Sequence, residues 1–223
     1  MTDVDELAKL LITGNKIFHY DNFAGTEHLG ETLVSTGAVT RNLQSVLLET
    51  GVYFPSSARV YYTTPIFNPK LSSLFFKARF SSGSDVLAYA GFTESLANPV
   101  HDSVETHAGL LIYNGGVYFS SGYTHGTAAK FRNVRISGID PTRWLVYKIS
   151  GHEFSWFPLP VVVPYFDDFI VSKPGNVWSN VTRNSDAQPL NQAHYFQAFI
   201  QNETNENKTF ELEKLLHVER QPD

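Results

Sequence analysis

Residues 74–92 read LFFKARF, then SSGSD, then VLAYAGF. The two longer runs are rich in aromatic and aliphatic side chains, which is typical of β-strands. The small polar residues between them are typical of a turn. This stretch therefore predicts two strands, 74–80 and 86–92, joined by a hairpin turn at 81–85.

The same pattern continues on both sides of this stretch, with turn residues at intervals of roughly 8 to 15 residues from Lys16 onward. Asn114-Gly115-Gly116 is the clearest tight turn, because Asn and Gly tolerate a positive φ. No segment alternates helix with strand, so we expect an all-β sandwich of two antiparallel sheets, not a parallel α/β sheet. Further strands are expected at 16–22, 31–34, 45–48, 58–63, 108–113, 116–121, 130–135, 144–149, 153–157, 161–163, 166–171, 193–201 and 210–217.

The N-terminus has a different pattern. Thr2 or Asp3 can cap a helix, Val4, Leu7 and Leu10 follow helical spacing, and Gly14 ends the pattern. We expect a short N-terminal helix within residues 1–14, with a frayed arm as the alternative. No internal repeat or linker divides the remainder, so residues 15–223 are expected to form a single β-sandwich domain.

The composition excludes several classes of protein. The 223 residues include no cysteine, which rules out a disulfide scaffold and a cysteine nucleophile. The net charge is −5 and no clustered basic surface is evident, so no nucleic-acid partner is expected. Only 17% of residues are charged whereas 14% are aromatic, which suits a sandwich whose polar faces are largely uncharged.

Targeting signals are not evident. The acidic start of the chain does not resemble a signal peptide, and its longest near-apolar run, 154–166, contains three prolines and is too short to span a membrane. We expect no membrane partner and, by default, a cytoplasmic or virion-associated protein. A removed signal peptide stays open, and glycosylation sequons begin at Asn180, Asn202 and Asn207.

Several segments together resemble a known family. They are YTTPIF (62–67) leading into LFFKARF (74–80), VLAYAGF (86–92) as its paired strand, the Trp-led hairpin RWLVYKI (143–149) with GHEFSWF (151–157), and the closing strand FELEKLLHV (210–218). Their order resembles the concanavalin A-like lectin and glucanase superfamily. The resemblance implies a jelly-roll sandwich of the kind shared by legume lectins, laminarin-degrading hydrolases and laminin-G modules, and it concerns the fold and not the function.

The catalytic motif of the glucanases in this family is missing. Retaining enzymes of this fold place two carboxylates on one strand, as E-x-D-x-E or E-x-D-x-x-E, about 5 Å apart. The nearest acids here are Glu94, Asp102 and Glu105, in a stretch that reads as loop. Glu211 and Glu213 share a strand face but are expected to face solvent. We therefore do not expect hydrolysis by this mechanism.

The loop 94–107 gathers three acids and two histidines, and it is the best metal candidate in the chain. Its spacing matches no standard metal motif, so a solvated loop is the preferred interpretation. We expect no metal site and no cofactor.

Aromatic residues among amides are the most informative functional feature, because a sugar offers an apolar C–H face and a rim of hydroxyls. Trp144 and Trp156 are expected in the core. The candidate ligand-binding residues are Tyr113, Tyr118, Tyr123 and His125, then Asn176, Trp178 and Asn180, together with Glu94.

These residues favour a non-catalytic carbohydrate-binding module with a glycan ligand. For each aromatic residue, the alternative is that it packs over the rim of the sandwich. Two other functions stay open: a structural or assembly protein, such as a virion or surface component that forms a homo-oligomer, and a divergent polysaccharide hydrolase or lyase.

Overall fold

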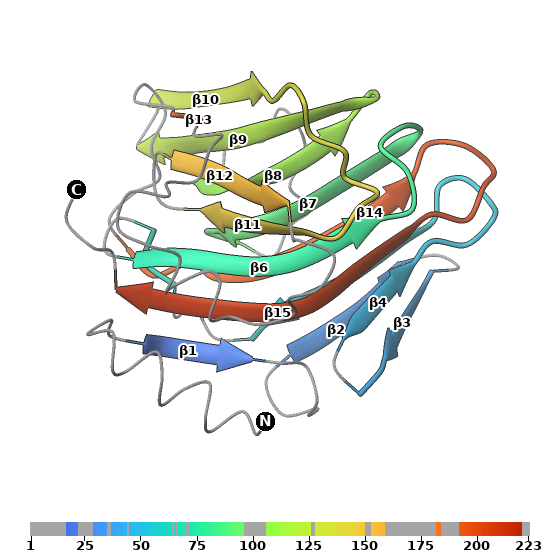
Figure 1. The fold of residues 1–223 in the computed structure, drawn as a ribbon, viewed down its shortest axis with the longest axis horizontal. Helices are drawn as coiled ribbons and strands as arrows, with labels where there is room; N and C mark the ends of the chain where they lie inside the picture. Colours follow the sequence, from blue (N-terminus) through green and yellow to red (C-terminus); the bar gives the residue numbers. More distant parts are fainter. Residues whose placement is uncertain are drawn as a thin grey trace.

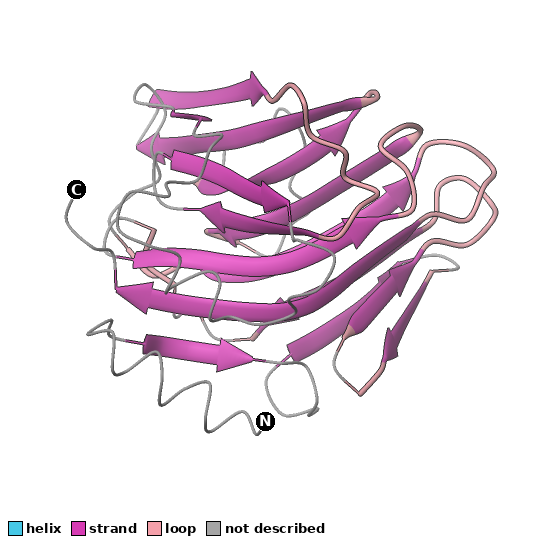
Figure 2. Ribbon diagram, in the orientation of Figure 1, coloured by secondary structure: helices cyan, strands magenta, loops and turns pink. Residues whose placement is uncertain are grey.

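The computed structural model describes residues 17–21, 29–34, 37–43, 45–63, 65, 67–69, 72–95, 106–125, 128–149, 153–158, 182–183 and 192–219. These residues form two antiparallel β-sheets packed face to face (Figure 1). Within the described ranges there are strands, turns and loops but no helix (Figure 2). The expected N-terminal helix lies outside the described residues. The part of the chain that is described therefore contains no helix that could cross a membrane.

One sheet has eight strands, and β1 (Ile17–Asp21) pairs with its strand β15 outside the main order. That order is β13 (Thr182–Arg183), β12 (Glu153–Pro158), β11 (Leu145–Ile149), β6 (Ser72–Phe80), β15 (Thr209–Glu219), β4 (Val46–Glu49) and β3 (Ala38–Arg41). The second sheet has seven strands. They are, in order, β10 (Ala128–Arg135), β9 (Gly116–His125), β8 (His107–Tyr113), β7 (Val86–Thr93), β14 (Tyr195–Asn202), β5 (Ser57–Tyr62) and β2 (Leu29–Val34). The expected two-sheet β-sandwich is confirmed.

The core lies between the sheets and is filled by alternate residues of each strand. Aromatic rings join the two layers. Phe119 of β9 stacks on Phe154 of β12 with ring centroids 5.6 Å apart, and Phe76 of β6 meets Phe196 of β14 at 6.3 Å. These rings are almost fully buried, so they supply much of the apolar area that stabilises the sandwich.

The predicted hairpin at 81–85 is wrong. β6 belongs to the eight-stranded sheet and β7 to the seven-stranded sheet, so this turn carries the chain from one layer to the other. Both edges of β6 are already paired, one with β11 and the other with β15, which leaves β7 no position beside it. For the same reason 86–92 is not the paired strand of 74–80. Its neighbours are β8 and β14.

The tight turn at Asn114-Gly115 is confirmed, with φ of 48° and 69° at its two central residues. One expected boundary needs correction, because β9 continues to His125 instead of ending at 121. Two short strands, β3 and β13, were not expected. The strands expected at 161–163 and 166–171 lie outside the described residues.

Trp144 is not a core residue. It precedes β11, is half-buried, and its ring faces the cations of Lys77 and Arg79 at 5.1 and 4.7 Å on the outer side of the eight-stranded sheet. Trp156 lies in β12, but its side chain is outside what the structure describes.

Candidate functional site

The outer face of the seven-stranded sheet, turned away from the core, carries a group of tyrosines. Alternation places them there. In β7, for example, Ala88 and Ala90 belong to the core while Tyr89 between them belongs to a separate outer cluster. We call this surface the tyrosine face and define it by one tyrosine from each of the strands β5, β7, β8, β9 and β14, namely Tyr61, Tyr89, Tyr113, Tyr118 and Tyr195.

Strand register arranges part of this face as a row that crosses the sheet. The paired positions run in the order Tyr118, Leu111, Tyr89, Phe199 and Arg59. Adjacent strands lie about 4.8 Å apart, so a row across five strands extends about 19 Å. The tyrosine face is therefore long enough for an extended ligand, not only for a single ring.

Glycines on β7 and β8 allow Tyr89 to lie flat on the sheet. Gly91 and Gly109 are directly paired, and a Cβ at Gly109 would come within 2.6 Å of the Tyr89 ring. The Tyr89 hydroxyl donates to the carbonyl oxygen of Phe92 at 2.5 Å. Burial raises the pKa of this hydroxyl well above its ordinary value, so it stays protonated as a donor.

The face has a buried base and a more accessible rim. Tyr89, Leu111 and Phe199 are at most 1% exposed. Tyr113 and Tyr118 are half-buried and pack against this cluster. Tyr61 and Tyr195 are also half-buried. The partly exposed rims of these tyrosines therefore rest on a base that is itself buried.

Polar groups are interspersed with these rings. The Arg59 guanidinium lies 5.8 Å from the Phe199 ring centroid, and burial lowers the pKa of Arg59 from its usual value. His107 Nε2 and Ser120 Oγ share a hydrogen bond of 2.8 Å, and both residues are buried. On the strands of this sheet the sequence has one acid, Glu31 of β2. The face therefore combines aromatic surface with hydrogen-bonding groups and almost no carboxylate.

The candidate residues are only partly brought together. Tyr113 and Tyr118 meet on the same outer cluster. Tyr123 and His125 lie beyond the end of the strand expected at 116–121, but the structure places both in β9, and their side chains are outside the described residues. Asn176, Trp178 and Asn180 also lie outside the described residues, so their place in the site stays a prediction.

Glu94 follows the last residue of β7 and links neighbouring segments. Its carboxylate accepts hydrogen bonds from Gln192 Nε2 at 3.0 Å and from the Thr106 amide at 3.3 Å. Partial burial opposes ionisation, but these hydrogen bonds and the nearby His194 outweigh it and lower the pKa of Glu94. The ionised carboxylate thus ties the end of β7 to the segments before β8 and β14.

No metal centre is evident in the described ranges, where no group of three or more His, Asp or Glu side chains could hold an ion. The structure describes both ends of the candidate metal loop 94–107. Glu94 is hydrogen-bonded to Gln192, and His107 is hydrogen-bonded to Ser120. Residues 96–105 lie outside the description.

Glu211 and Glu213 lie on the outer side of the eight-stranded sheet, as expected, but they are not free in solvent. Their side chains are 18% and 16% exposed, and both form ion pairs there. Glu211 accepts from Arg79 at 2.7 Å, and Glu213 pairs with Lys77. The sequence did contain a sign of these ion pairs, because two acids spaced i and i+2 in β15 match two cations spaced i and i+2 in β6. It could not be used, because nothing in either segment shows that β6 pairs with β15.

Sequence reasoning also missed Tyr61, Tyr89, Tyr195 and Arg59. Each was assigned to a strand but not to a ligand face. Their alternation with core residues was the available signal, and it identifies a common face only when the order of the strands is known.

No protein-family model matches the sequence, and no curated protein matches it either. Solved structures do match its fold. The laminarinase from Flavobacterium sp. UMI-01 has a TM-score of 0.59 at 13% identity, covering 92% of this chain and 100% of that chain. A β-1,3-1,4-glucanase (lichenase) from a mouse hindgut metagenome has a TM-score of 0.56 at 12% identity, covering 89% of this chain and 97% of that chain.

The exoplasmic/lumenal domain of VIP36 in its Ca²⁺-bound form is similar to the same degree. Its TM-score is 0.59 at 11% identity, with 92% of this chain and 91% of that chain covered. The chain therefore has the concanavalin A-like lectin and glucanase fold, as the sequence resemblance implied. Identity this low establishes the fold alone.

Proposed function

We propose that the protein binds carbohydrate through the tyrosine face and performs no hydrolysis there. The observation that carries this proposal is the construction of this face, in which the half-buried Tyr113 and Tyr118 pack against a buried base of aromatic and aliphatic side chains. Stacked rings match the apolar C–H faces of sugars, and tyrosine hydroxyls and Arg59 supply hydrogen bonds to the sugar hydroxyls.

The solved relatives support this ligand class. They include laminarinases and a lichenase, and the VIP36 domain has also been solved with Man3GlcNAc bound. Because the fold hosts both enzymes and lectins, the choice between them depends on residues of this chain.

Those residues favour binding over catalysis. Retaining hydrolysis needs two carboxylates about 5 Å apart in one cleft. The strands beneath the tyrosine face carry a single acid, Glu31, at the edge strand β2. The one pair on a described strand at alternate positions, Glu211 and Glu213, belongs to the other sheet and is engaged by Arg79 and Lys77.

The remaining candidates complete the proposal. Tyr113 and Tyr118 contribute stacking surface. The further contacts proposed are Tyr123, His125, Asn176, Trp178 and Asn180, with Glu94 at the end of β7.

An assembly protein remains the second candidate function. No described feature favours it over carbohydrate binding.

The test is a glycan array followed by calorimetric titration with a soluble β-1,3-glucan. We expect Tyr118→Ala to weaken binding about tenfold, equivalent to about 1.4 kcal/mol. Tyr118→Phe should bind nearly as well as the parent because the ring is kept. Equal affinity for the Ala variant, or no glycan bound in either assay, would contradict the proposal. A defined large oligomer in light scattering without glycan binding would favour the assembly function.

A further inference from the structure

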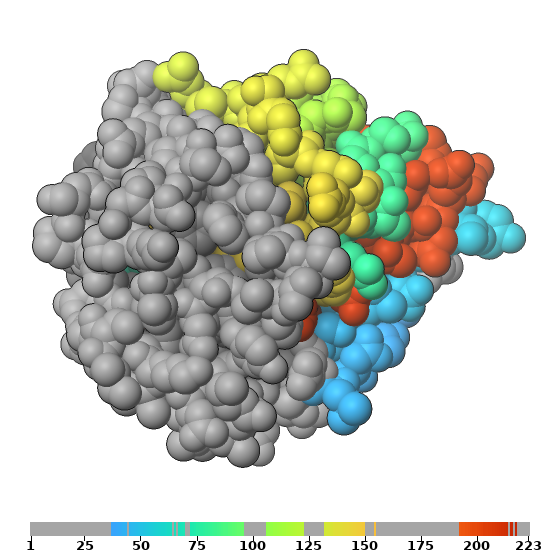
Figure 3. All heavy atoms as spheres, viewed as in Figure 1, coloured from blue at the N-terminus to red at the C-terminus, as the bar shows by residue number. Residues whose placement is uncertain are grey.

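A second aromatic surface lies at one end of the sandwich, in the loop between β4 and β5. Val52, Tyr53 and Phe54 are 51%, 71% and 54% exposed, although all three are apolar or aromatic. We call these three residues the tip. In Figure 3 the cyan atoms of this part of the chain project at the right-hand edge of the molecule. The tyrosine face has no residue in this loop.

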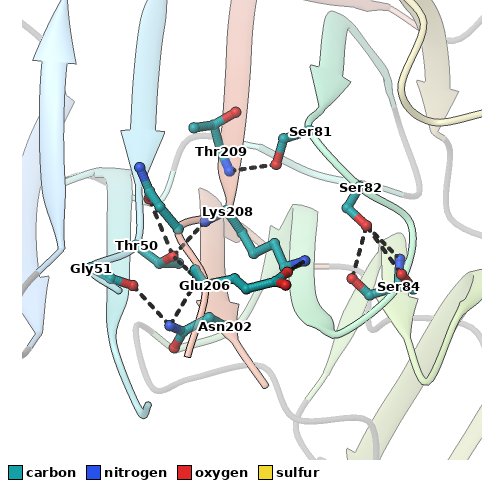
Figure 4. Close-up of polar contacts among 10 residues, drawn as sticks. Thr50, Gly51, Ser81, Ser82, Ser84, Asn202, Glu206, Lys208 and Thr209 are labelled. Carbon is teal, nitrogen blue, oxygen red and sulfur yellow. Dashed lines mark hydrogen bonds and ion pairs between the residues drawn. The ribbon is translucent and has the colours of Figure 1, made fainter. Parts of the chain in front are cut away.

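The tip stands on a dense hydrogen-bonded frame formed with the β14–β15 loop, which lies beside it in Figure 1. Asn202 is fully buried; its Oδ1 accepts from the Ser56 amide at 2.8 Å. Its Nδ2 donates to the carbonyl oxygens of Gly51 at 2.8 Å and Glu206 at 3.1 Å. Figure 4 shows Asn202 joining these two loops.

Further bonds extend the frame to the tip itself. The Phe54 amide donates to Asn205 Oδ1 at 3.0 Å, and the Gly51 amide donates to Ser56 Oγ at 2.6 Å. The Thr50 amide donates to the Lys208 carbonyl oxygen at 2.9 Å, and the Lys208 amide returns a bond of 2.8 Å to Thr50 Oγ1. The aromatic side chains are thus presented by an ordered loop, so a ligand need not supply the free energy of ordering it.

The size of the tip limits what it can hold. An aromatic side chain presents about 150–250 Å² when fully accessible, so the exposed parts of the three residues amount to roughly 300 Å². A stable interface between proteins needs about 800 Å² on each partner. The tip alone is therefore too small to hold a second copy of the chain, whereas it suits one or two rings of a small ligand.

The charges and polar groups around the tip limit the class of ligand further. The frame carries acidic side chains, Glu203 and Glu206, and the ammonium of Lys208 is engaged by Glu206 at 2.7 Å. An anionic membrane surface is attracted by clustered cations, whereas the β4–β5 and β14–β15 loops, both described in full, carry Lys208 as their single cation. Two exposed amides lie on the same frame: Asn205 accepts from the Phe54 amide, and Asn207 lies next to Thr50, at the start of the loop that carries the tip. Aromatic rings flanked by amides are the groups that recognise a neutral sugar.

We infer that the tip is a second carbohydrate-contacting site, in which Tyr53 and Phe54 stack on sugar rings and Asn205 and Asn207 bind their hydroxyls. It extends the proposed function to another surface without depending on the tyrosine face. A polysaccharide chain that engages both sites gains avidity that a short oligosaccharide does not.

The experiment is affinity electrophoresis of the full chain in native gels containing soluble β-1,3-glucan or soluble β-1,3-1,4-glucan, both of which are neutral. The variants are Tyr53→Ala, Phe54→Ala and Tyr118→Ala. Leu43→Ala is the matched control, because Leu43 is 89% exposed but lies in the β3–β4 loop. Thermal unfolding of each variant checks that it folds, as expected for side chains that contact solvent.

We expect Tyr53→Ala and Phe54→Ala each to weaken retardation at least fivefold in at least one gel, and Leu43→Ala to leave it unchanged. Loss in Tyr118→Ala with no change in the tip variants would overturn this inference and leave the proposed function standing. Loss of retardation in the tip variants, with none in Tyr118→Ala, would support the tip site and contradict the proposed role of the tyrosine face. No retardation in any gel, or tip-dependent binding to neutral phosphatidylcholine vesicles in its place, would also overturn the inference.

Discussion

The tyrosine face depends on single residues, and Gly91 is the most constrained of them. A Cβ at Gly91 would lie 2.4 Å from the Ala108 carbonyl oxygen and 2.5 Å from the Gly109 Cα, both backbone atoms that cannot move aside. We expect Gly91→Ala to lower the free energy of unfolding by about 2–3 kcal/mol, measured by urea denaturation. Gly115→Ala is the control. Gly115 has φ of +69° but no atom within 4 Å of its Cβ position, so only about 1–2 kcal/mol of backbone strain is expected. A smaller loss at Gly91 than at Gly115 would contradict the packing argument.

His194 makes stability depend on pH. The residue is fully buried, its Nδ1 donates to the Gln192 carbonyl oxygen at 2.8 Å, and no hydrogen bond to its Nε2 is found in the described ranges. Burial lowers the pKa of His194, and the Gln192 hydrogen bond and the Glu94 charge only partly oppose this. The unfolded chain, with an ordinary value of about 6.5, then binds a proton more readily than the folded chain. Stability is therefore complete above about pH 6.5 and falls as the pH is lowered through and below that value.

The variant His194→Asn separates this effect from packing. Asparagine can keep a donor toward Gln192 but cannot titrate. We expect its free energy of unfolding to change less than that of the parent between about pH 7.5 and pH 5. The difference between the two proteins at pH 7.5 gives the packing loss alone, because His194 is neutral there. Parallel pH profiles for the two proteins would show that His194 does not carry the dependence.

At the scale of elements, the frame of the β4–β5 and β14–β15 loops depends on Asn202. Its sequon suggests a surface residue, but the side chain is buried and its donor and acceptor atoms are all engaged within the frame. Asn202→Ala would leave the Ser56 amide and the carbonyl groups of Gly51 and Glu206 without this partner. We expect a loss of about 2–4 kcal/mol in urea denaturation. Asn205→Ala, which removes one exposed hydrogen bond, should cost less than about 1 kcal/mol. Similar losses in both variants would show that the frame is not held at Asn202.

Strand positions were predictable from the sequence, whereas strand partners were not. Alternation and turn residues are local, so β7, β8 and β11 lie where the sequence places them, to within one or two residues. The crossing at 81–85 was misread because a short polar turn looks the same whether it joins neighbours in one sheet or two layers. The end of β9 was misread because Gly122 interrupts its apolar pattern. The tyrosine face shares this limit, because Tyr61, Tyr89 and Tyr195 meet only through the pairing of β5 and β7 with β14.

At the scale of the whole molecule, the two sheets divide the charge between them. The strands of the seven-stranded sheet contain one acid, Glu31. Those of the eight-stranded sheet contain Asp21, Glu49, Glu153, Glu211, Glu213 and Glu219. The few acidic residues on the strands are therefore unevenly distributed between the two sheets. The sheet that carries the tyrosine face is the one whose strands are nearly without carboxylates, which suits stacking on a neutral ligand and leaves no carboxylate pair for hydrolysis there.

The last strands of the chain occupy central places in both sheets. β14 lies between β7 and β5, and β15 lies between β6 and β4. Neither sheet is complete without these strands, because removing them leaves long unpaired strand edges and exposes one side of the core. We expect a chain truncated after residue 191 to lack a cooperative thermal transition in circular dichroism and to bind a hydrophobic dye. A chain lacking only residues 220–223 keeps all of β15 and is the control, expected to unfold as cooperatively as the parent. If the shorter fragment unfolded in one cooperative transition, β1 to β13 would be a folding unit by themselves. The C-terminal strands would then be an addition to the sandwich and not its closure.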